Sequence, residues 1–292
     1  MKYLNLDTSF SPFGKSIAFE AFTFNGGEPH IKIVEELNSK EEIMITTRIQ
    51  SFNDVGFLLL ANDALRRMGI RKINLFLPYF PAARQDRVMV AGEPLSVKVY
   101  ADLINAANFY EVIIVDPHSE VTSAVLNNVV TISNHEFVTH CLEGLEDFIL
   151  ISPDGGALKK IYKLSAFMDG VPVVECSKKR DVKTGKLSGF AVYSNDLKGA
   201  ICVIVDDICD GGGTFLGLAT ELKAKNAGEL ILIVTHGILS KGLETLSSVF
   251  DKIYSTNSFS NIENTSTFQQ INLKEIINNS VEGFTFSEAV NY

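Results

Sequence analysis

Short apolar runs alternate along the chain with longer stretches in which apolar residues recur at helical spacing. The runs that most resemble strands each end in polar residues or a turn signal, and they lie at residues 72–79, 111–118, 147–154, 200–207 and 229–236. Helical stretches fall between them, at residues 52–69, 94–108, 156–170 and 214–228. This alternation is typical of βα units built around a parallel sheet. It predicts an α/β fold in which ligand-binding groups gather at the carboxyl ends of the strands.

The same rhythm occurs in both parts of the chain, which predicts two α/β halves of similar plan. With 292 residues, 46% of them hydrophobic, the chain is long enough to bury two cores. The boundary falls in the region from Val129 to Phe148, and we assign residues 1–134 to the first domain and residues 135–292 to the second. Gly69, Gly170 and Gly228 each follow a helical stretch and are predicted to serve as its C-cap.

Charge and composition exclude several classes of partner. The formal net charge of -9 argues against binding to nucleic acid or to an anionic membrane, because both need a positive field. No apolar run reaches the roughly 18 residues of a membrane helix. The four cysteines have no CxxC spacing and predict reduced thiols. We therefore expect a cytoplasmic protein that meets any anionic substrate locally, for instance through a metal.

One stretch combines groups of opposite chemistry. An apolar run from Ile201 to Val205 leads into acids, glycines and the start of a helical stretch, namely Asp206, Asp207, Asp210, Gly211, Gly212, Gly213 and Thr214. Backbone N–H groups at a helix N-terminus bind phosphate, and glycines let the main chain approach the anion. Carboxylates accept hydrogen bonds from sugar hydroxyls or bind Mg²⁺. The stretch predicts a ribose phosphate site, with an acidic turn at the end of a strand as the alternative.

A second stretch is cationic in an otherwise acidic chain. Residues 177–190 are polar and contain glycine, and they place Lys178, Lys179 and Arg180 together. This pattern predicts an exposed loop between strands, and a solvated hairpin without a ligand is the alternative.

With these two stretches, motifs along nearly the whole chain resemble those of the ribose-phosphate pyrophosphokinases, also called phosphoribosyl-diphosphate synthetases. The acidic stretch resembles the DDxxDTxGT sugar-phosphate loop of that family. In chain order, the other matching segments are LPYFPAARQDR, GEPLSVKVYADLINAA, VDPHSE, ISPDGGALKK, SKKR, VTHGILS and YSTNS. They are similar to the family's PYFPYARQD, REPIS, DLH, SPDAGG, flexible catalytic loop, ATHGVLS and TNT segments. A series in the same order is more specific than any single motif.

The resemblance implies two Rossmann-like domains of the type I phosphoribosyltransferase kind, with parallel sheets flanked by helices and the site in the cleft between the domains. It implies an Mg²⁺-dependent diphosphotransferase that moves the β,γ-diphosphoryl group of ATP to the anomeric hydroxyl of ribose 5-phosphate. The products are phosphoribosyl diphosphate, used in nucleotide biosynthesis, and AMP. Because the transition state spreads negative charge over phosphate oxygens, such catalysis rests on positioning, magnesium and cations.

The resemblance also assigns roles to single residues. The matched positions are Lys178 and Arg180 for catalysis, Arg84 and Gln85 for ATP, His118 and Asp154 for the metal, and the Asp206 to Thr214 stretch for ribose and phosphate. Each also has a plainer interpretation: His118 as an ordinary hydrogen-bonded histidine, Asp154 as a turn former, and Arg84 as a partner of Asp86 in a surface ion pair.

The nucleotide-binding segment departs from the family pattern. The family's FxDGE matches FNGGE here, in which Phe24 and Glu28 remain candidates for ATP binding but Gly26 replaces the aspartate. In related enzymes this segment serves a neighbouring subunit's site, which implies a homo-oligomer. Gly92 replaces the arginine of REPIS, which argues against regulation by phosphate or ADP.

The sugar loop departs as well, because Gly211 replaces the threonine of DTxGT. The change removes a hydroxyl that would hydrogen-bond the 5-phosphate and opens space at that point. An alternative acceptor is therefore a ribose with a larger 5′ substituent, such as ADP-ribose, which would place the enzyme in NAD metabolism. A phosphoribosyltransferase shares the acidic loop but needs neither ARQD nor KKR, and a non-catalytic regulatory subunit is the third hypothesis.

Overall fold

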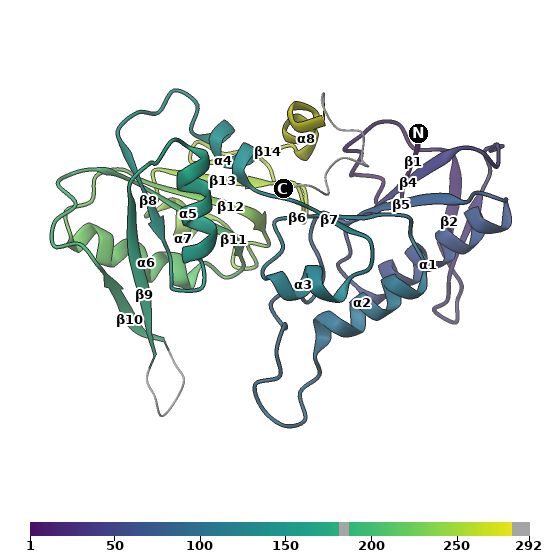
Figure 1. Cartoon of the computed structure of the whole chain (residues 1–292), viewed down its shortest axis with the longest axis horizontal. Coiled ribbons are helices and arrows are strands. Elements are labelled where there is room, and N and C mark those ends of the chain that lie inside the picture. The colour runs from purple at the N-terminus through teal and green to yellow at the C-terminus, as the bar shows by residue number, and fades with distance from the viewer. Residues whose placement is uncertain (181–186, 282–292) are drawn as a thin grey trace. The chain divides into compact units, whose positions relative to one another are not determined.

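The computed structural model describes the backbone of residues 1–180 and 187–281, and the side chains of these ranges apart from residues 179, 180, 187, 188 and 278–281. The chain divides into two compact units, one of residues 1–133 with the segment that starts at Leu273, and one of residues 134–272 (Figure 1). The boundary placed after residue 134 differs from this division by one residue. The segment from Leu273 belongs with the first unit, whereas the sequence pattern placed it in the second.

The first unit is built on a parallel sheet with the order β1-β4-β5-β6-β7. Its strands are β1 (Lys2–Asn5), β4 (Glu42–Thr46), β5 (Lys72–Phe76), β6 (Val112–Val115) and β7 (Val129–Ile132). Its helices are α1 (Phe52–Arg67), α2 (Ser96–Ala106), α3 (Glu120–Val125) and α8 (Leu273–Val281). A separate antiparallel hairpin joins β2 (Phe19–Thr23) to β3 (Pro29–Ile33). Helix α1 begins where Ser51 and Asp54 form a capping box, which satisfies backbone N–H groups of its first turn.

The second unit has a sheet with the order β10-β9-β8-β11-β12-β13-β14, in which β9 and β10 pair antiparallel and the other neighbours pair parallel. Its strands are β8 (Phe148–Ser152), β9 (Val173–Arg180), β10 (Leu187–Val192), β11 (Ile201–Cys209), β12 (Leu230–Gly237), β13 (Lys252–Thr256) and β14 (Phe268–Ile271). Its helices are α4 (His135–Cys141), α5 (Leu158–Phe167), α6 (Gly213–Ala224) and α7 (Glu244–Ser247).

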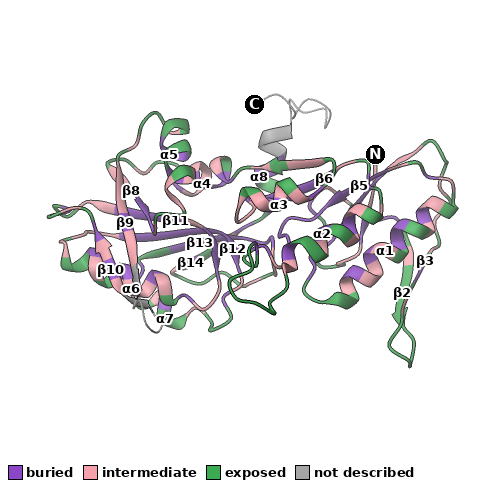
Figure 2. Ribbon diagram, turned by 60° about the horizontal axis from the view of Figure 1, so that its bottom comes forward, coloured by how far each residue is buried: buried purple, intermediate pink, exposed green. Residues whose placement is uncertain are grey.

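Each unit has its own core, formed by strands that helices cover. Every residue of β12 is buried, because α4 and α5 lie on one side of the second sheet and α6 and α7 on the other (Figure 2). A parallel sheet covered on both faces has nearly continuous apolar strands, as the runs in the sequence predicted. The predicted α/β fold with parallel sheets is confirmed.

The order of the second sheet creates a topological switch point between β8 and β11. From β8 the chain passes through α5 to β9 on one side, and from β11 it passes through α6 to β12 on the other side. In open α/β sheets, ligands bind outside the carboxyl ends of the strands at such a point. The loop after β8 carries Asp154, and the end of β11 carries Asp206 and Asp207. Strand order therefore brings the acids of two separate motifs to one edge.

One of the three predicted helix caps is confirmed, because Gly69 directly follows the last residues of α1 and has a φ of 92°, in the left-handed region that favours glycine. The prediction for Gly170 was wrong by one residue, because α5 ends at Phe167 and Asp169, with φ 57°, is the first left-handed residue after it. The prediction for Gly228 was wrong, because α6 ends at Ala224 and Asn226 takes the left-handed conformation instead. Gly228 meets a different need, since a Cβ there would lie 2.3 Å from the carbonyl oxygen of Gly199.

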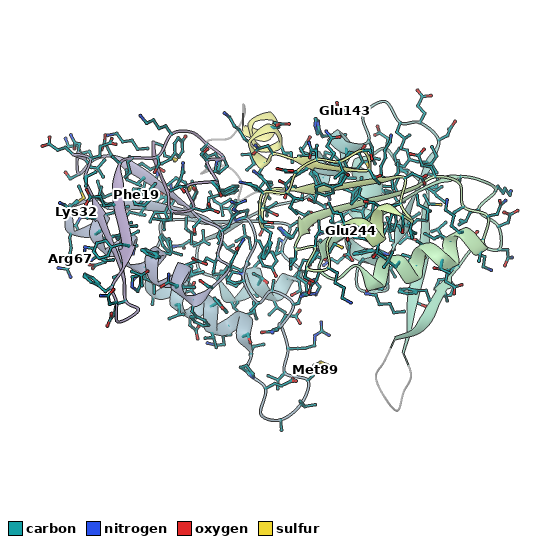
Figure 3. The ribbon with its side chains drawn as sticks, turned by 180° about the vertical axis from the view of Figure 1, so that it is seen from behind. Phe19, Lys32, Arg67, Met89, Glu143 and Glu244 are labelled. Carbon is teal, nitrogen blue, oxygen red and sulfur yellow. The ribbon has the colours of Figure 1, made fainter. Side chains whose placement is uncertain are left out.

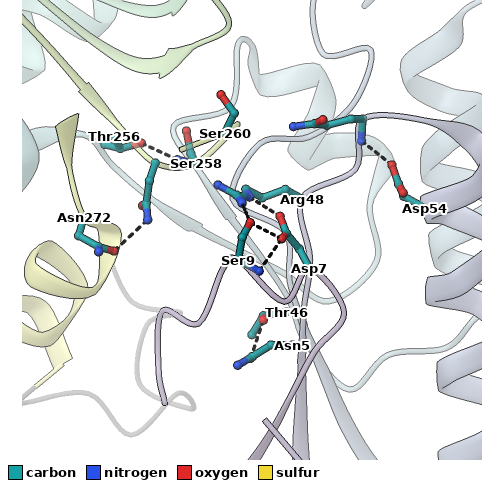
Figure 4. Close-up of polar contacts among 12 residues, drawn as sticks. Asn5, Asp7, Ser9, Thr46, Arg48, Asp54, Thr256, Ser258, Ser260 and Asn272 are labelled. Atoms are coloured by element: carbon teal, nitrogen blue, oxygen red, sulfur yellow. Dashed lines mark hydrogen bonds and ion pairs between the residues drawn. The ribbon is translucent and has the colours of Figure 1, made fainter. Parts of the chain in front are cut away.

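A partly buried ion pair supports the first unit at the carboxyl ends of β1 and β4. The Arg48 Nε atom lies 2.6 Å from Oδ2 of Asp7, and its Nη2 donates to Ser9 Oγ (Figure 4). The guanidinium also stacks over the ring of Phe10. Burial acts to raise the pKa of Asp7, but the hydrogen bond and charge of Arg48 outweigh it and lower that pKa. The pair therefore holds two neighbouring loops together.

The structure also bears on membrane-spanning helices and on the state of the cysteines. Within the described ranges, no helix has both the length and the apolar character needed to cross a membrane. The four cysteines are free thiols, and three of them are buried.

Candidate active site

Two adjacent carboxylates stand at the end of β11. Asp207 is buried and its backbone N–H donates to Oδ1 of Asp206 at 3.0 Å, while Asp206 pairs in register with Val234 of β12. Burial raises the pKa of Asp206 well above its usual range, and the negative charges of Asp207 and Asp154 raise it further. A cation or a hydroxyl donor at this point would relieve that repulsion.

Asp154 forms an ion pair with a lysine from the cationic stretch. Its Oδ2 lies 2.5 Å from Nζ of Lys178, and its Oδ1 accepts the backbone N–H groups of Gly156 at 2.9 Å and Ala157 at 3.1 Å. Burial acts to raise the pKa of Asp154, but the bond and charge of Lys178 and the two N–H groups outweigh it and lower that pKa. Asp154 is therefore held as a carboxylate, and it is a turn former as well.

A small pocket lies beside the carboxylates of β11. Asp206 and Asp207 share it with Lys160 of α5, and its other lining residues are Asn134, Ala157, Ile161, Leu164 and Val205. Acidic and basic groups therefore line one hollow on the carboxyl side of the switch point.

The glycines after β11 open the N-terminus of α6. Gly212 is its N-cap residue with φ 72°, and a Cβ there would lie 3.1–3.2 Å from the side chain of Leu246, so both backbone and space require glycine. No side chain caps this helix end, and the first backbone bond back to Gly212 comes from the N–H of Leu216. Such an uncapped helix N-terminus, here at Gly213 and Thr214, suits an anion.

The loop that follows β12 packs onto the same glycines. Ser240 Oγ donates to Oδ1 of Asp210 at 2.6 Å, and the Ser240 N–H donates to the Asp210 carbonyl at 3.2 Å. The next residue, Lys241, passes beside Gly211, since a Cβ on Gly211 would lie 3.4 Å from Cε of Lys241.

In the first unit, the candidates for ATP and metal lie on the loops after β5 and β6. Arg84 and Gln85 are exposed, and His118 is half-buried. Asp86, which follows Gln85, is buried and pairs with Arg87, whose Nε lies 3.0 Å from Oδ1 of Asp86. Burial acts to raise the pKa of Asp86, but Arg87 and His118 help to lower it, so the two loops lie close. The loop after β5 continues into solvent, where Met89 is 73% exposed (Figure 3).

Phe24 and Glu28 lie on the turn of the β2–β3 hairpin. Phe24 is 51% exposed and meets Phe22 edge-on with ring centroids 4.8 Å apart, while the ring of His30 lies 5.5 Å away. The carboxylate of Glu28 lies over Gly26, because a Cβ there would come within 2.5 Å of Oε2. Glu28 thus takes up the space that a side chain at position 26 would need.

Within the second unit, the structure brings together Asp154, Lys178, Asp206 and Asp207. The ion pair of Lys178 with Asp154 and the effect of Asp154 and Asp207 on the pKa of Asp206 show that these side chains are close. Arg180 ends β9, but its side chain lies outside the described residues. The predicted loop over residues 177–190 was too long, because its first four residues extend β9 and its last four belong to β10. Sequence reasoning missed Lys160, Ser240 and Lys241; the position of Lys241 directly after the VTHGILS motif was the signal available.

The donors fit the magnesium ion that the resemblance implies. No group of three or more His, Cys, Asp or Glu side chains stands ready to hold a metal within the part of the chain that the structure describes. Mg²⁺ keeps several waters and is usually held by one or two carboxylates together with substrate phosphates, rather than by an all-protein cage. Asp154, held as a carboxylate by its ion pair with Lys178, is a donor of that kind.

Comparisons with known proteins agree with this arrangement. Residues 15–107 match the N-terminal domain of ribose phosphate pyrophosphokinase, and residues 131–271 match the phosphoribosyl transferase domain. The chain is 32% identical over 245 residues to the ribose-phosphate pyrophosphokinase of Hyphomonas neptunium, covering 82% of this chain and 78% of that protein. It is 29% identical over 255 residues to that of Mycoplasmopsis pulmonis, covering 86% of this chain and 79% of that protein.

A solved structure shares the fold. The phosphoribosylpyrophosphate synthetase from Mycobacterium smegmatis superimposes with a TM-score of 0.81 at 24% identity, covering 92% of this chain and 90% of the other. That likeness shows the two-domain α/β architecture. The paired acids and open helix end of β11–α6, together with sequence matches over both domains, show that the chain belongs to the ribose-phosphate pyrophosphokinase family of diphosphotransferase enzymes.

Proposed function

We propose that the protein transfers the β,γ-diphosphoryl group of ATP to the anomeric hydroxyl of ribose 5-phosphate. The hydroxyl oxygen attacks the β phosphorus, the bond from that phosphorus to the α–β bridging oxygen breaks, AMP leaves with this oxygen, and the hydroxyl proton passes to solvent. The main support for this proposal comes from the end of β11. Carboxylates that suit sugar hydroxyls adjoin an uncapped helix N-terminus that suits phosphate there. Because the N-terminal domain match covers residues 15–107, a single-domain phosphoribosyltransferase is a weaker hypothesis.

In the second unit, each group has a place in this reaction. Asp206, Asp207 and Asp210 accept hydrogen bonds from the ribose hydroxyls, and the N–H groups from Gly211 to Thr214 bind the 5-phosphate. Lys178 and Arg180 neutralise the charge that develops on the transferring group, which is the main requirement of phosphoryl transfer. The ion pair of Lys178 with Asp154 supports this role, since it orients the ammonium group.

In the first unit, the proposed roles concern ATP. Arg84 and Gln85 hold the nucleotide, Phe24 stacks on the adenine and Glu28 accepts a hydrogen bond from it. The exposure of Phe24 supports this, because an exposed aromatic ring is available to a ligand. His118 is a proposed ligand of Mg²⁺, as Asp154 is in the second unit, and the ion would neutralise phosphate charge when bound.

Gly211 favours a second candidate acceptor, ADP-ribose. Its φ lies outside the left-handed region and a Cβ would meet only the stem of Lys241, so the fold itself does not require glycine there. Space at this point suits a ribose with a substituent beyond its 5-phosphate, and the product would belong to NAD metabolism. A Gly211→Thr variant is expected to shift preference toward ribose 5-phosphate.

The test is AMP release from ATP and Mg²⁺ with each acceptor, with mass analysis for an added diphosphate. AMP with ribose 5-phosphate supports the main proposal, and AMP with ADP-ribose alone supports the second. No AMP with either acceptor contradicts both and supports the third hypothesis, a regulatory subunit of an active enzyme.

Two further properties remain part of the proposal. We expect a homo-oligomer in which the β2–β3 hairpin serves a neighbouring subunit's site, and light scattering after size-exclusion chromatography tests it. We also expect the protein in the cytoplasm, where its four free thiols would stay reduced. Fractionation of the producing cells tests the second expectation.

A further inference from the structure

The side chain missing at position 211 leaves space that a lysine from another loop borders. A Cβ built on Gly211 would lie 3.4, 3.5 and 3.8 Å from Cε, Cδ and Cγ of Lys241. The whole outer stem of Lys241 therefore runs along the glycine loop at van der Waals distance. Since one C–N bond of roughly 1.5 Å joins Cε to Nζ, the ammonium lies within about 5 Å of that Cβ position.

The backbone that carries Lys241 is held in place. The N–H groups of Ile238 and Leu239 both donate to the carbonyl of Cys209, at 2.9 and 3.0 Å, and Ser240 bonds Asp210 through its backbone and its hydroxyl. The turn closes where the N–H of Gly242 donates to the carbonyl of Leu239. The start of the Lys241 side chain is thus fixed relative to the loop after β11, although 30 residues separate the two in sequence.

The charge of Lys241 is available to a ligand. Lys241 is exposed, and the structure gives its ammonium no hydrogen bond or ion pair among the residues that it describes. Asp210, the acid of the loop after β11 that the neighbouring Ser240 contacts, already accepts the hydroxyl of Ser240 at 2.6 Å. A compact ammonium beside open backbone N–H groups is a frequent phosphate ligand in proteins.

We propose that Lys241 is a specificity-determining residue that binds the phosphate on the 5′ side of the acceptor ribose. The phosphate is the terminal group of ribose 5-phosphate or the first group of the diphosphate in ADP-ribose, and the chemistry recognised is the same. Lys241 reaches it over Gly211, so its ammonium replaces the contact that a hydroxyl side chain at position 211 would make. This inference rests on the proposed function, because it takes the loop after β11 as the acceptor site.

The experiment measures binding and turnover separately, on the full chain. Ribose 5-phosphate and ADP-ribose are each titrated calorimetrically into wild type, Lys241→Gln, Lys241→Arg and the control Lys163→Gln, which removes an exposed charge of α5 in the same unit. Steady-state AMP release then gives KM for the acceptor and for ATP.

We expect Lys241→Gln to weaken binding of the phosphorylated acceptor about tenfold or more, as for a lost hydrogen bond to a charged group. Lys241→Arg keeps the charge and should retain affinity within about threefold, and Lys163→Gln should match wild type. KM for ATP should not change. The acceptor that loses affinity identifies which compound supplies the phosphate.

The outcomes separate this inference from the proposed function. Unchanged acceptor binding by Lys241→Gln, or an equal loss for ATP, overturns the role of Lys241 even where wild type releases AMP. Binding that depends on Lys241 in a protein that releases no AMP supports the inference and contradicts the proposed reaction. Wild type that binds neither acceptor contradicts both.

Discussion

The Nζ atom of Lys178 lies 2.5 Å from Oδ2 of Asp154, which joins the end of strand β9 to the loop after β8. Both side chains are partly exposed, at 22% and 27%. The pair is therefore accessible to a ligand, and the lysine is oriented before any substrate arrives. Because solvent reaches the ion pair, the stability of the fold depends little on it, since ion pairs at the surface contribute about 0–1 kcal/mol.

Replacement of Lys178 by alanine should lower turnover about 100-fold or more, because it removes a charge proposed to stabilise the transition state. The free energy of unfolding should change by less than about 1 kcal/mol. Single-turnover AMP release and urea unfolding measure the two quantities, with Lys163→Ala as the control. Full turnover in the variant would remove Lys178 from the mechanism.

The pKa of Asp206 predicts a dependence of stability on pH. Because burial and the charges of Asp207 and Asp154 raise that pKa in the folded state, stability is greatest below the unfolded value of about 3.9 and is lost as pH rises toward the raised value. The hydrogen bond from the backbone N–H of Asp207 acts in the opposite direction. Asp206→Asn should therefore be more stable than wild type at pH 7.5, by about 2–4 °C in Tm for each kcal/mol relieved.

Thermal unfolding at pH 4.5, 6.0 and 7.5 tests this expectation. The difference in Tm between Asp206→Asn and wild type should grow with pH, while the exposed Asp169→Asn should show no such trend. A difference independent of pH would mean that Asp206 does not titrate as its burial predicts.

Gly211 and Gly212 are adjacent in sequence but should respond differently to substitution by alanine. Gly212→Ala places a side chain at φ 72° and within 3.2 Å of the buried Leu246, so it should cost about 1–2 kcal/mol or more. Gly211→Ala meets only ordinary contacts with Lys241 and should change stability by less than about 0.5 kcal/mol. Urea unfolding of the two variants measures the difference, and equal losses of stability would contradict the different environments of the two glycines.

His118→Ala should raise the Mg²⁺ concentration needed for half-maximal AMP release by about tenfold or more, because a proposed metal ligand is lost. His140→Ala is the control, since the Nδ1 atom of His140 lies 3.2 Å from Oε1 of Glu143 in the second unit. The plainer interpretation of His118 would be favoured by an unchanged Mg²⁺ requirement in both variants.

The strongest elements were predictable from local pattern. The buried strands β5, β6, β8, β11 and β12 and the helices α1, α2, α5 and α6 follow from apolar runs and helical periodicity, since each depends on residues close in sequence. The short strands β1 and β4 and the β2–β3 hairpin were not identified. Residues 19–23 of that hairpin are mostly exposed and lack a clear alternation, so they carry little signal.

Local pattern in the sequence predicts the α/β class, the two halves and the order of the motifs, including the acids and glycines after residue 205. Which of these motifs meet depends on the tertiary fold. The sheet order β8-β11-β12 brings Asp154 to Asp206, and backbone bonds from the loop after β12 place Lys241 over Gly211. Periodicity reports which face of an element is buried, whereas neighbours in a sheet are chosen by packing between elements far apart in the chain.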